Sequence, residues 1–142
     1  MFTHLHVHSC YSLMRGASQL EALVTAAHRH GMTHLAITDT NGFYGLPNFL
    51  ETARKHKISP IVGVQVTARD GEAVLLARTP EAYPCLSELI SRRHLEDTFS
   101  LTQALASGLP GLVVLSSDLQ LPPLCAHARG GRAGMQHPVS LL

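Results

Sequence analysis

The sequence predicts an α/β protein that forms part of a β/α barrel, or a small open sheet, with mostly parallel strands. Three observations support this. Short apolar runs alternate with helical stripes in the order strand, helix, strand, helix, strand. Residues 35–37 form a continuous apolar run, which is typical of a strand buried on both faces. The length of 142 residues is below the roughly 200 residues that a closed β/α barrel needs.

The amino-terminal segment is predicted to be the first strand. Residues 3–8 alternate in polarity, which places His4, His6 and His8 on one face. Ser18 and Glu21 then have the spacing of a capping box at the start of a helix. Apolar side chains follow at helical spacing, at Leu20, Leu23, Val24 and Ala27.

The same signals repeat after the second strand at residues 35–37. A turn composition at residues 39–42 precedes a second helical stripe, which ends in a basic turn suited to the negative end of the helix dipole. The apolar positions of this stripe are Leu46, Phe49, Leu50 and Ala53. Residues 61–64 begin a third strand.

The remaining elements begin with a hairpin. Asp70 and Gly71 predict a tight turn into a strand over residues 73–77. Three more elements are expected after it: a helix that begins near Thr79 and Pro80, a short helix over 101–105 and a strand over 112–115.

The regular pattern stops near Pro122, after which proline and glycine are frequent. We therefore predict one partial domain over residues 1–121 and an irregular carboxyl-terminal tail over residues 122–142. A partial barrel leaves a strand edge unpaired, so self-association is also expected.

Composition excludes several classes of protein. Charged residues make up 15% of the chain, and the formal net charge is +1. A balanced chain lacks the concentrated basic face of a protein that binds nucleic acid strongly. The sequence has no apolar run of membrane-spanning length and no signal peptide, and its three cysteines have no metal-binding or disulfide spacing. A soluble cytoplasmic protein with free thiols is expected.

The sequence contains 10 histidines, and two of them form the main candidate site. His6 and His8 lie at the carboxyl end of the predicted first strand, where two imidazoles at this spacing can share one metal ion. Asp39 follows the second strand at an equivalent level. The alternative is that all three are solvated polar residues at strand ends. Cys10 is a second, weaker candidate, as a nucleophile beside the histidines.

Several motifs together resemble the PHP (polymerase and histidinol phosphatase) domain, and most closely the amino-terminal PHP domain of bacterial DNA polymerase III alpha subunits, including the error-prone type. They occur in consistent order within residues 1–121: HLHVHS at 4–9, YSL at 11–13, LAITD at 35–39 and PIVG at 60–63. The resemblance implies a partial, truncated version of the family's distorted β/α barrel, which holds up to three metal ions at the carboxyl ends of its strands.

The resemblance carries over only part of the family's ligand set. His6 and His8 match the paired histidines, and Asp39 belongs to a motif that normally continues with histidine. An aspartate, a histidine and a glutamate of the family are replaced here by Arg15, Thr40 and Gln65. Because an arginine and neutral side chains do not offset divalent cations, the site is expected to be degenerate, with an Arg15–Asp39 ion pair in place of the metals. No metal is expected, or at most one zinc or manganese ion.

Two functional readings follow from the resemblance. The first is a non-catalytic amino-terminal fragment of a polymerase III alpha-like protein, active in DNA replication or error-prone repair synthesis. Its partners would be the rest of the polymerase chain and a proofreading exonuclease or other replisome subunits. Nucleotidyltransfer would belong to the longer parent, because this chain has no room for a polymerase palm. The second is a small metal-dependent phosphoesterase that uses His6, His8 and Asp39.

Overall fold

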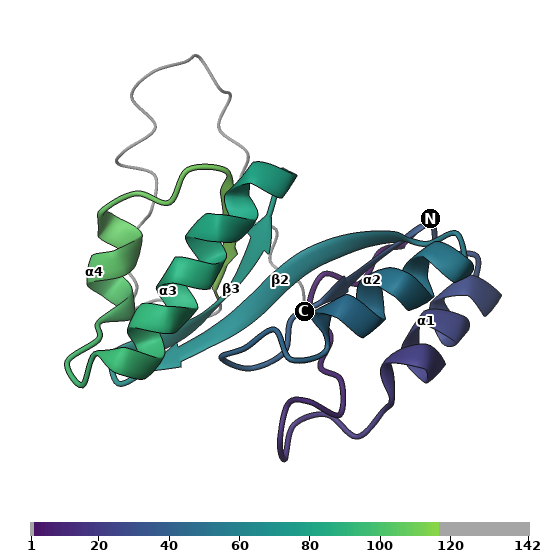
Figure 1. Cartoon of the computed structure of the whole chain (residues 1–142), viewed down its shortest axis with the longest axis horizontal. Coiled ribbons are helices and arrows are strands. Elements are labelled where there is room, and N and C mark those ends of the chain that lie inside the picture. Colours follow the sequence, from purple (N-terminus) through teal and green to yellow (C-terminus); the bar gives the residue numbers. More distant parts are fainter. Residues whose placement is uncertain (1, 117–142) are drawn as a thin grey trace.

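The computed structural model of the chain describes residues 2–116. Helices and strands alternate over residues 20–68, and both helices of the first half pack beside each other (Figure 1). The elements are α1 (Leu20–Arg29), β1 (His34–Ile37), α2 (Leu46–Lys55), β2 (Ser59–Ala68), β3 (Gly71–Ala77), η1 (Pro80–Ala82), α3 (Tyr83–Leu95), α4 (Leu101–Ala106) and β4 (Leu112–Leu115). Within residues 2–116, no helix is long and apolar enough to cross a membrane.

The four strands form one sheet in the order β1-β2-β3-β4. β1 and β2 pair in parallel, whereas β3 pairs antiparallel with both β2 and β4. β1, β2 and β4 therefore run in one direction, and β3 alone is reversed. The prediction of mostly parallel pairing is not confirmed, because the two-residue turn between β2 and β3 can join only antiparallel neighbours. This turn is formed by Arg69 and Asp70, one residue before the predicted Asp70–Gly71 turn, and Gly71 is already the first residue of β3. The part of the chain that is described forms an open sheet and no closed barrel.

Two apolar cores lie under the helices. In the first, α1 and α2 cover β1 with buried side chains that include Val24, Leu35 and Phe49. In the second, α3 and α4 cover β2 and β3, with Leu75 and Leu86 fully buried. The long strand β2 extends from one helix pair to the other (Figure 1).

The amino-terminal segment differs from the predicted strand over residues 3–8. It runs along β1, where Ala36 N–H donates to the His4 carbonyl at 3.0 Å and Thr38 N–H donates to the Val7 carbonyl at 2.9 Å. The segment thus advances three residues while β1 advances two, so the ladder is interrupted as it is at a β-bulge. Val7 N–H donates instead to the Thr38 hydroxyl oxygen, at 3.0 Å. The segment is extended but is not a regular strand.

The start of α1 also differs from the prediction. The helix begins at Leu20 after an extended Gln19, and no side chain caps it, so the predicted Ser18–Glu21 capping box does not form. The other helical stripes occur where the sequence predicts them, and the hairpin turn does so to within a residue. The predicted tail over residues 122–142 lies outside the described residues, and the boundary at residue 121 remains a prediction.

Asp70 ties the β2–β3 hairpin to the start of α4. Its carboxylate accepts hydrogen bonds from the Ser100 hydroxyl at 2.7 Å and from the backbone N–H groups of Leu101 and Thr102 at 3.1 and 2.9 Å. Partial burial opposes the charge, but these hydrogen bonds outweigh it and hold the pKa of Asp70 below its usual range. The carboxylate also lies at the positive end of the α4 dipole.

We expect Asp70→Asn to lower the free energy of unfolding by about 1 kcal/mol at pH 7, because three donors lose a charged acceptor. A carboxylate whose pKa is depressed on folding stabilises the protein above its unfolded pKa of about 4 and loses that effect as the pH falls. The difference between the two proteins should therefore shrink below about pH 4. Urea denaturation across this range measures it. Asp97→Asn is the control, because Asp97 is exposed and forms no ion pair or hydrogen bond within residues 2–116; an equal loss there would contradict the assignment.

Candidate functional site

The two histidines predicted from the sequence lie side by side. His6 Nε2 and His8 Nε2 are 3.1 Å apart, and the two rings meet edge to face. Two nitrogen ligands of one tetrahedral zinc ion lie about 3.3 Å apart, given zinc–nitrogen bonds of about 2.0–2.1 Å. The pair therefore has the spacing of two ligands that share an ion. His6 is exposed and His8 is half-buried.

The ring of His8 contacts the loop over residues 9–16 through Ser12. Its Nδ1 lies 2.9 Å from the hydroxyl oxygen of Ser12. Burial lowers the pKa of His8, and neighbouring His6 and Arg15 lower it further, against the opposing effects of Asp39 and of a hydrogen bond with Gln65. A low pKa favours the neutral imidazole, which is the form that binds metal ions.

Asp39 lies near His8, and the Ser12 hydroxyl stands between the two side chains. Asp39 is only 3% exposed, and its carboxylate accepts three hydrogen bonds. The donors are Ser9 N–H at 2.7 Å, the Ser9 hydroxyl at 2.6 Å and the Ser12 hydroxyl at 2.6 Å. Asp39 thus connects to His8 through Ser12, and its two oxygens are used to hold the loop.

Arg15 has partners other than the predicted one. Its guanidinium donates to Gln65 Oε1 at 3.1 Å and lies 3.6 Å from a Glu72 carboxylate oxygen. The expected Arg15–Asp39 ion pair is therefore wrong. Asp39 already accepts three hydrogen bonds from Ser9 and Ser12. The β2–β3 hairpin brings Gln65 and Glu72 within reach of Arg15 instead.

Thr40 continues the strand pairing past the end of β1. It forms a parallel bridge with Gln65, and its backbone N–H donates to the Ser12 hydroxyl at 3.1 Å. Its own hydroxyl oxygen is buried without a hydrogen-bond partner, the one such side-chain atom within residues 2–116. Thr40 is thus part of the site through its backbone.

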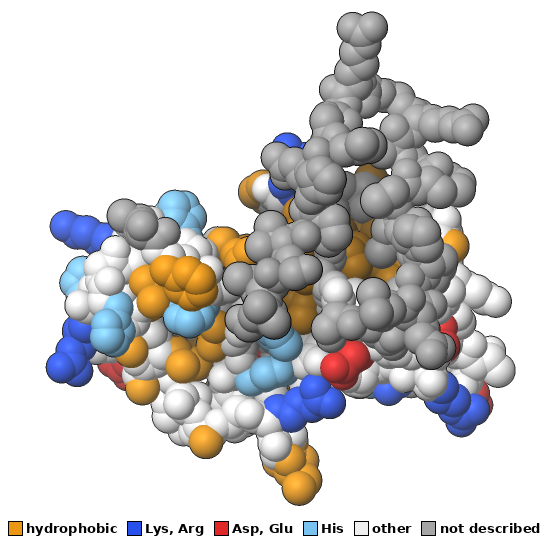
Figure 2. All heavy atoms as spheres, turned by 180° about the vertical axis from the view of Figure 1, so that it is seen from behind, with side chains coloured by type: hydrophobic (Ala, Val, Ile, Leu, Met, Phe, Trp, Pro, Cys, Tyr) orange, Lys and Arg blue, Asp and Glu red, His pale blue; other side chains and the backbone are white. Residues whose placement is uncertain are grey.

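A small cavity of about 230 Å³ opens beside His6. It is lined on one side by Gln65 and Glu72 and on the other by Val74, Leu115 and their neighbours. On this face of the molecule, histidine, basic and acidic side chains gather in one region (Figure 2). The cavity is open to small solutes at the edge of the histidine pair.

The donor set does not complete a metal centre. Within residues 2–116, no group of three His, Cys, Asp or Glu side chains is placed to hold an ion. The oxygens of Asp39 are occupied by three donors, and Gln65 Oε1 faces a guanidinium. Among residues 2–116, only His6 and His8 are arranged as ligands, and this part of the chain supplies a two-nitrogen contact for an ion.

The remaining candidates are not brought into the site. His4 packs on the Phe2 ring, and His28 packs on His56. The Cys10 thiol is 3.4 Å from Gln19 Oε1 and has no histidine among the described residues as a hydrogen-bond partner, so this part of the chain supplies no base for a nucleophile. Sequence reasoning missed the roles of Ser9 and Ser12; two serines spaced three apart directly after the histidine pair were the available signal.

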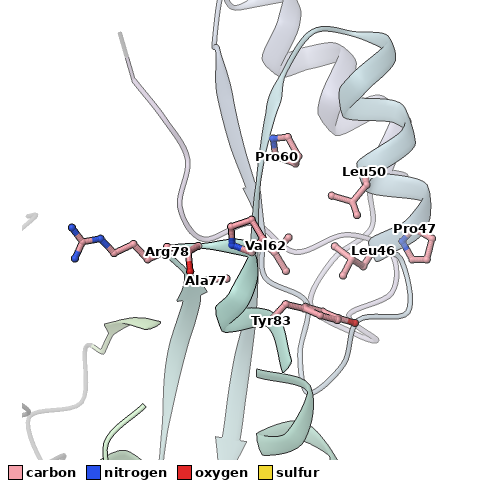
Figure 3. Close-up of a pocket in the computed structure, with 10 residues that line it drawn as sticks. Leu46, Pro47, Leu50, Pro60, Val62, Ala77, Arg78 and Tyr83 are labelled. Carbon is pink, nitrogen blue, oxygen red and sulfur yellow. The ribbon is translucent and has the colours of Figure 1, made fainter. Parts of the chain in front are cut away.

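A larger apolar cavity lies away from the histidines. It measures about 630 Å³ and lies between α2, β2 and the start of α3. Leu46, Leu50, Val62 and Tyr83 surround it, whereas the Arg78 guanidinium points away (Figure 3). None of the predicted site residues lines it.

Two solved structures share this fold. An amidohydrolase from Chromobacterium violaceum, described with bound sulfate and no metal, aligns with a TM-score of 0.51 and 27% identity over 63% of this chain and 32% of its own. A protein from Bifidobacterium adolescentis, provisionally assigned as a metal-dependent phosphoesterase, aligns with a TM-score of 0.53 and 20% identity over 76% of this chain and 40% of its own. The second likeness concerns the fold alone.

The sequence matches the PHP domain family over residues 4–131, and the chain belongs to that family. The error-prone DNA polymerase of Symbiobacterium thermophilum is 43% identical over 95 residues. The DNA polymerase III subunit alpha of Buchnera aphidicola from Acyrthosiphon pisum is 41% identical over 100 residues. Each match covers 66% of this chain and 9% of the relative, so the chain spans about a tenth of the length of these relatives.

Gly16 closes the loop that holds the site, because a Cβ atom there would lie 2.1 Å from the Ser9 carbonyl oxygen. We expect Gly16→Ala to lower the free energy of unfolding by at least about 2 kcal/mol, since backbone must move. Gly42→Ala is the matched control: the nearest atoms to its added methyl all belong to the exposed Tyr44 ring, which can rotate away. Thermal or urea unfolding measures the change in stability of each variant. Equal losses in the two variants would rule out a special role for Gly16.

Proposed function

We propose that this chain is the amino-terminal PHP domain segment of a bacterial DNA polymerase III alpha-like protein, in which the metal site is degenerate and structural. The family match and the polymerase relatives support the assignment. The observation that carries the degenerate site is the contact of Arg15 with Gln65. The parent protein would act in the cytoplasm, in DNA replication or error-prone repair synthesis.

The physical argument is one of charge. A two-metal phosphoesterase centre needs carboxylates to offset several positive charges. At the positions that match family ligands, the chain has the fixed cation Arg15, the neutral Thr40 and the neutral Gln65. Arg15 lies between the loop and the β2–β3 hairpin, and its partners there are Gln65 and Glu72. We infer that the guanidinium replaces a metal ion as the positive group of this site.

The segment by itself is proposed to have no catalytic activity. Nucleotidyl transfer in the relatives would then belong to the nine-tenths of their length that lies outside the match. Its proposed partners are the rest of a polymerase chain and a proofreading exonuclease or another replisome subunit. The net charge of +1 argues against strong binding of nucleic acid by this segment alone.

Metal analysis tests the degenerate site. We expect the purified chain to hold at most one divalent ion, weakly bound through His6 and His8. Restoring the family ligands with Arg15→Asp, Thr40→His and Gln65→Glu together should raise zinc affinity on the order of tenfold or more, because a charge that repels the ion is replaced by donors that attract it.

Elemental analysis after dialysis and zinc titration by calorimetry give these values. Arg29→Asp is the control, because it makes the same charge reversal on an exposed position of α1 and should leave zinc affinity unchanged. Two or three ions per chain in the unmodified protein would overturn the proposal.

The second candidate function is a small metal-dependent phosphoesterase. The 3.1 Å separation of the two histidine nitrogens favours it, since this arrangement suits a shared ion. It requires zinc or manganese to stimulate hydrolysis of a model phosphodiester, and it requires His6→Ala to abolish that stimulation while His30→Ala does not. We expect no stimulation by either ion. Ion-dependent turnover that disappears only in His6→Ala would establish this candidate instead.

A further inference from the structure

The Ser12 hydroxyl lies between the buried carboxylate of Asp39 and the ring of His8. Its oxygen is 2.6 Å from Asp39 Oδ1 and 2.9 Å from His8 Nδ1. It also accepts the backbone N–H of Thr40, at 3.1 Å. Ser12 itself is 1% exposed, so water does not take the place of any of these partners.

The hydrogen atoms of this cluster can be assigned by counting donors and acceptors. An ionised carboxylate only accepts, so the single proton of the Ser12 hydroxyl points to Asp39. A hydroxyl oxygen has two lone pairs, and the Thr40 N–H occupies one of them. The other lone pair faces His8 Nδ1, and this contact is a hydrogen bond only if Nδ1 carries the hydrogen.

A neutral imidazole has one N–H group and one lone pair. With the hydrogen on Nδ1, the lone pair of His8 is on Nε2. That atom lies 3.1 Å from His6 Nε2, at the exposed end of the site. The Gln65 side chain, which also forms a hydrogen bond with His8, must then present its amide N–H to this ring, since its Oε1 accepts from Arg15. His6 is then the partner that adapts, because its exposed ring can present either an N–H or a lone pair.

We propose that Ser12 is a positioning residue: it couples the buried Asp39 carboxylate to His8 and holds that imidazole in the Nδ1–H tautomer, with its Nε2 lone pair directed at His6. Both the orientation of the ring and its tautomer follow from one hydroxyl. The inference goes beyond the proposed function, because it holds whether or not an ion binds between the two rings.

Ser9 provides a built-in control. Its hydroxyl also donates to Asp39, at 2.6 Å, and its side chain is also fully buried. It differs in that its other hydrogen bond is to the backbone N–H of Tyr11, at 3.2 Å, and not to His8. Loss of either hydroxyl removes one donor from the same carboxylate, but only the loss of Ser12 disconnects the imidazole.

The test is the tautomer of His8 in the full chain, stripped of metal with a chelator and kept at about pH 8, above the ordinary histidine pKa of about 6.5. Two-bond nitrogen–proton correlation spectra distinguish a protonated from an unprotonated ring nitrogen. We expect the wild-type ring to carry its hydrogen on Nδ1. Ser12→Ala should lower the ratio of the Nδ1–H to the Nε2–H form by about tenfold, whereas Ser9→Ala should leave it unchanged.

A wild-type His8 with its hydrogen on Nε2 overturns the proposal without any variant. Equal changes in Ser9→Ala and Ser12→Ala also overturn it, because they indicate general loosening of the loop. If Ser12→Ala does not fold, Ser12→Cys fills the site with a slightly larger side chain of the same shape and replaces the hydroxyl by a thiol, which is a weak donor and acceptor. A ratio in Ser12→Cys that matches the wild type would contradict the role of Ser12.

Discussion

The buried carboxylate of Asp39 is the constraint on which this end of the molecule depends. A charge that is 3% exposed is costly unless hydrogen bonds replace its hydration. Ser9 and Ser12 supply those bonds, and they do so only if the loop over residues 9–16 closes over the end of β1. The close approach of Gly16 to the Ser9 carbonyl is part of the same closure. The positions of His8 and Arg15 follow from the path of this loop.

The site contains two sets of polar groups, one on each side of the loop over residues 9–16. On the inner side, Asp39 and the serines form a closed set in which every donor has an acceptor. On the outer side, Arg15 spans the gap to Gln65 and Glu72 on neighbouring strands. His8 lies between them, and its pKa is lowered chiefly by burial, with His6 and Arg15 adding to the effect. Membership of the PHP domain family accounts for the framework in which these groups lie.

Local patterns predicted most of the secondary structure. The helical stripes and the tight turn between β2 and β3 depend on near neighbours in the chain, so their spacing indicates them to within a residue. Two features of the fold were not predicted from the sequence, for different reasons. The segment over residues 3–8 alternates like a strand, but its register against β1 slips because Val7 bonds to the Thr38 hydroxyl. The antiparallel pairing of β4 with β3 depends on how two helices return the chain, which no short pattern records.

The candidate site was predictable as a location and not as a network. The sequence grouped His6, His8 and Asp39 at one edge of the sheet. The structure links Asp39 to His8 through the Ser12 hydroxyl, and a role of the three residues as metal ligands remains a prediction. The partner of Arg15 was wrong, because the sequence does not reveal that Ser9 and Ser12 have already satisfied Asp39. Which donors satisfy a buried carboxylate depends on the folded structure. In the sequence, the two serines that satisfy Asp39 look like ordinary loop residues.

The strand β2 has a consequence for how the molecule comes apart. It packs against α2 near one end and against α3 and α4 toward the other, and the two apolar cores share no buried side chain. Each helix pair with its part of the sheet therefore has an apolar core of its own. The two halves are coupled through the backbone of β2 and through a small buried cluster of Ala36, Val74 and Leu76, which joins β1 to β3. Slow exchange of amide hydrogens in the middle of β2 would require both halves to stay closed, so this strand reports the stability of the whole, whereas each helix pair reports only its own half.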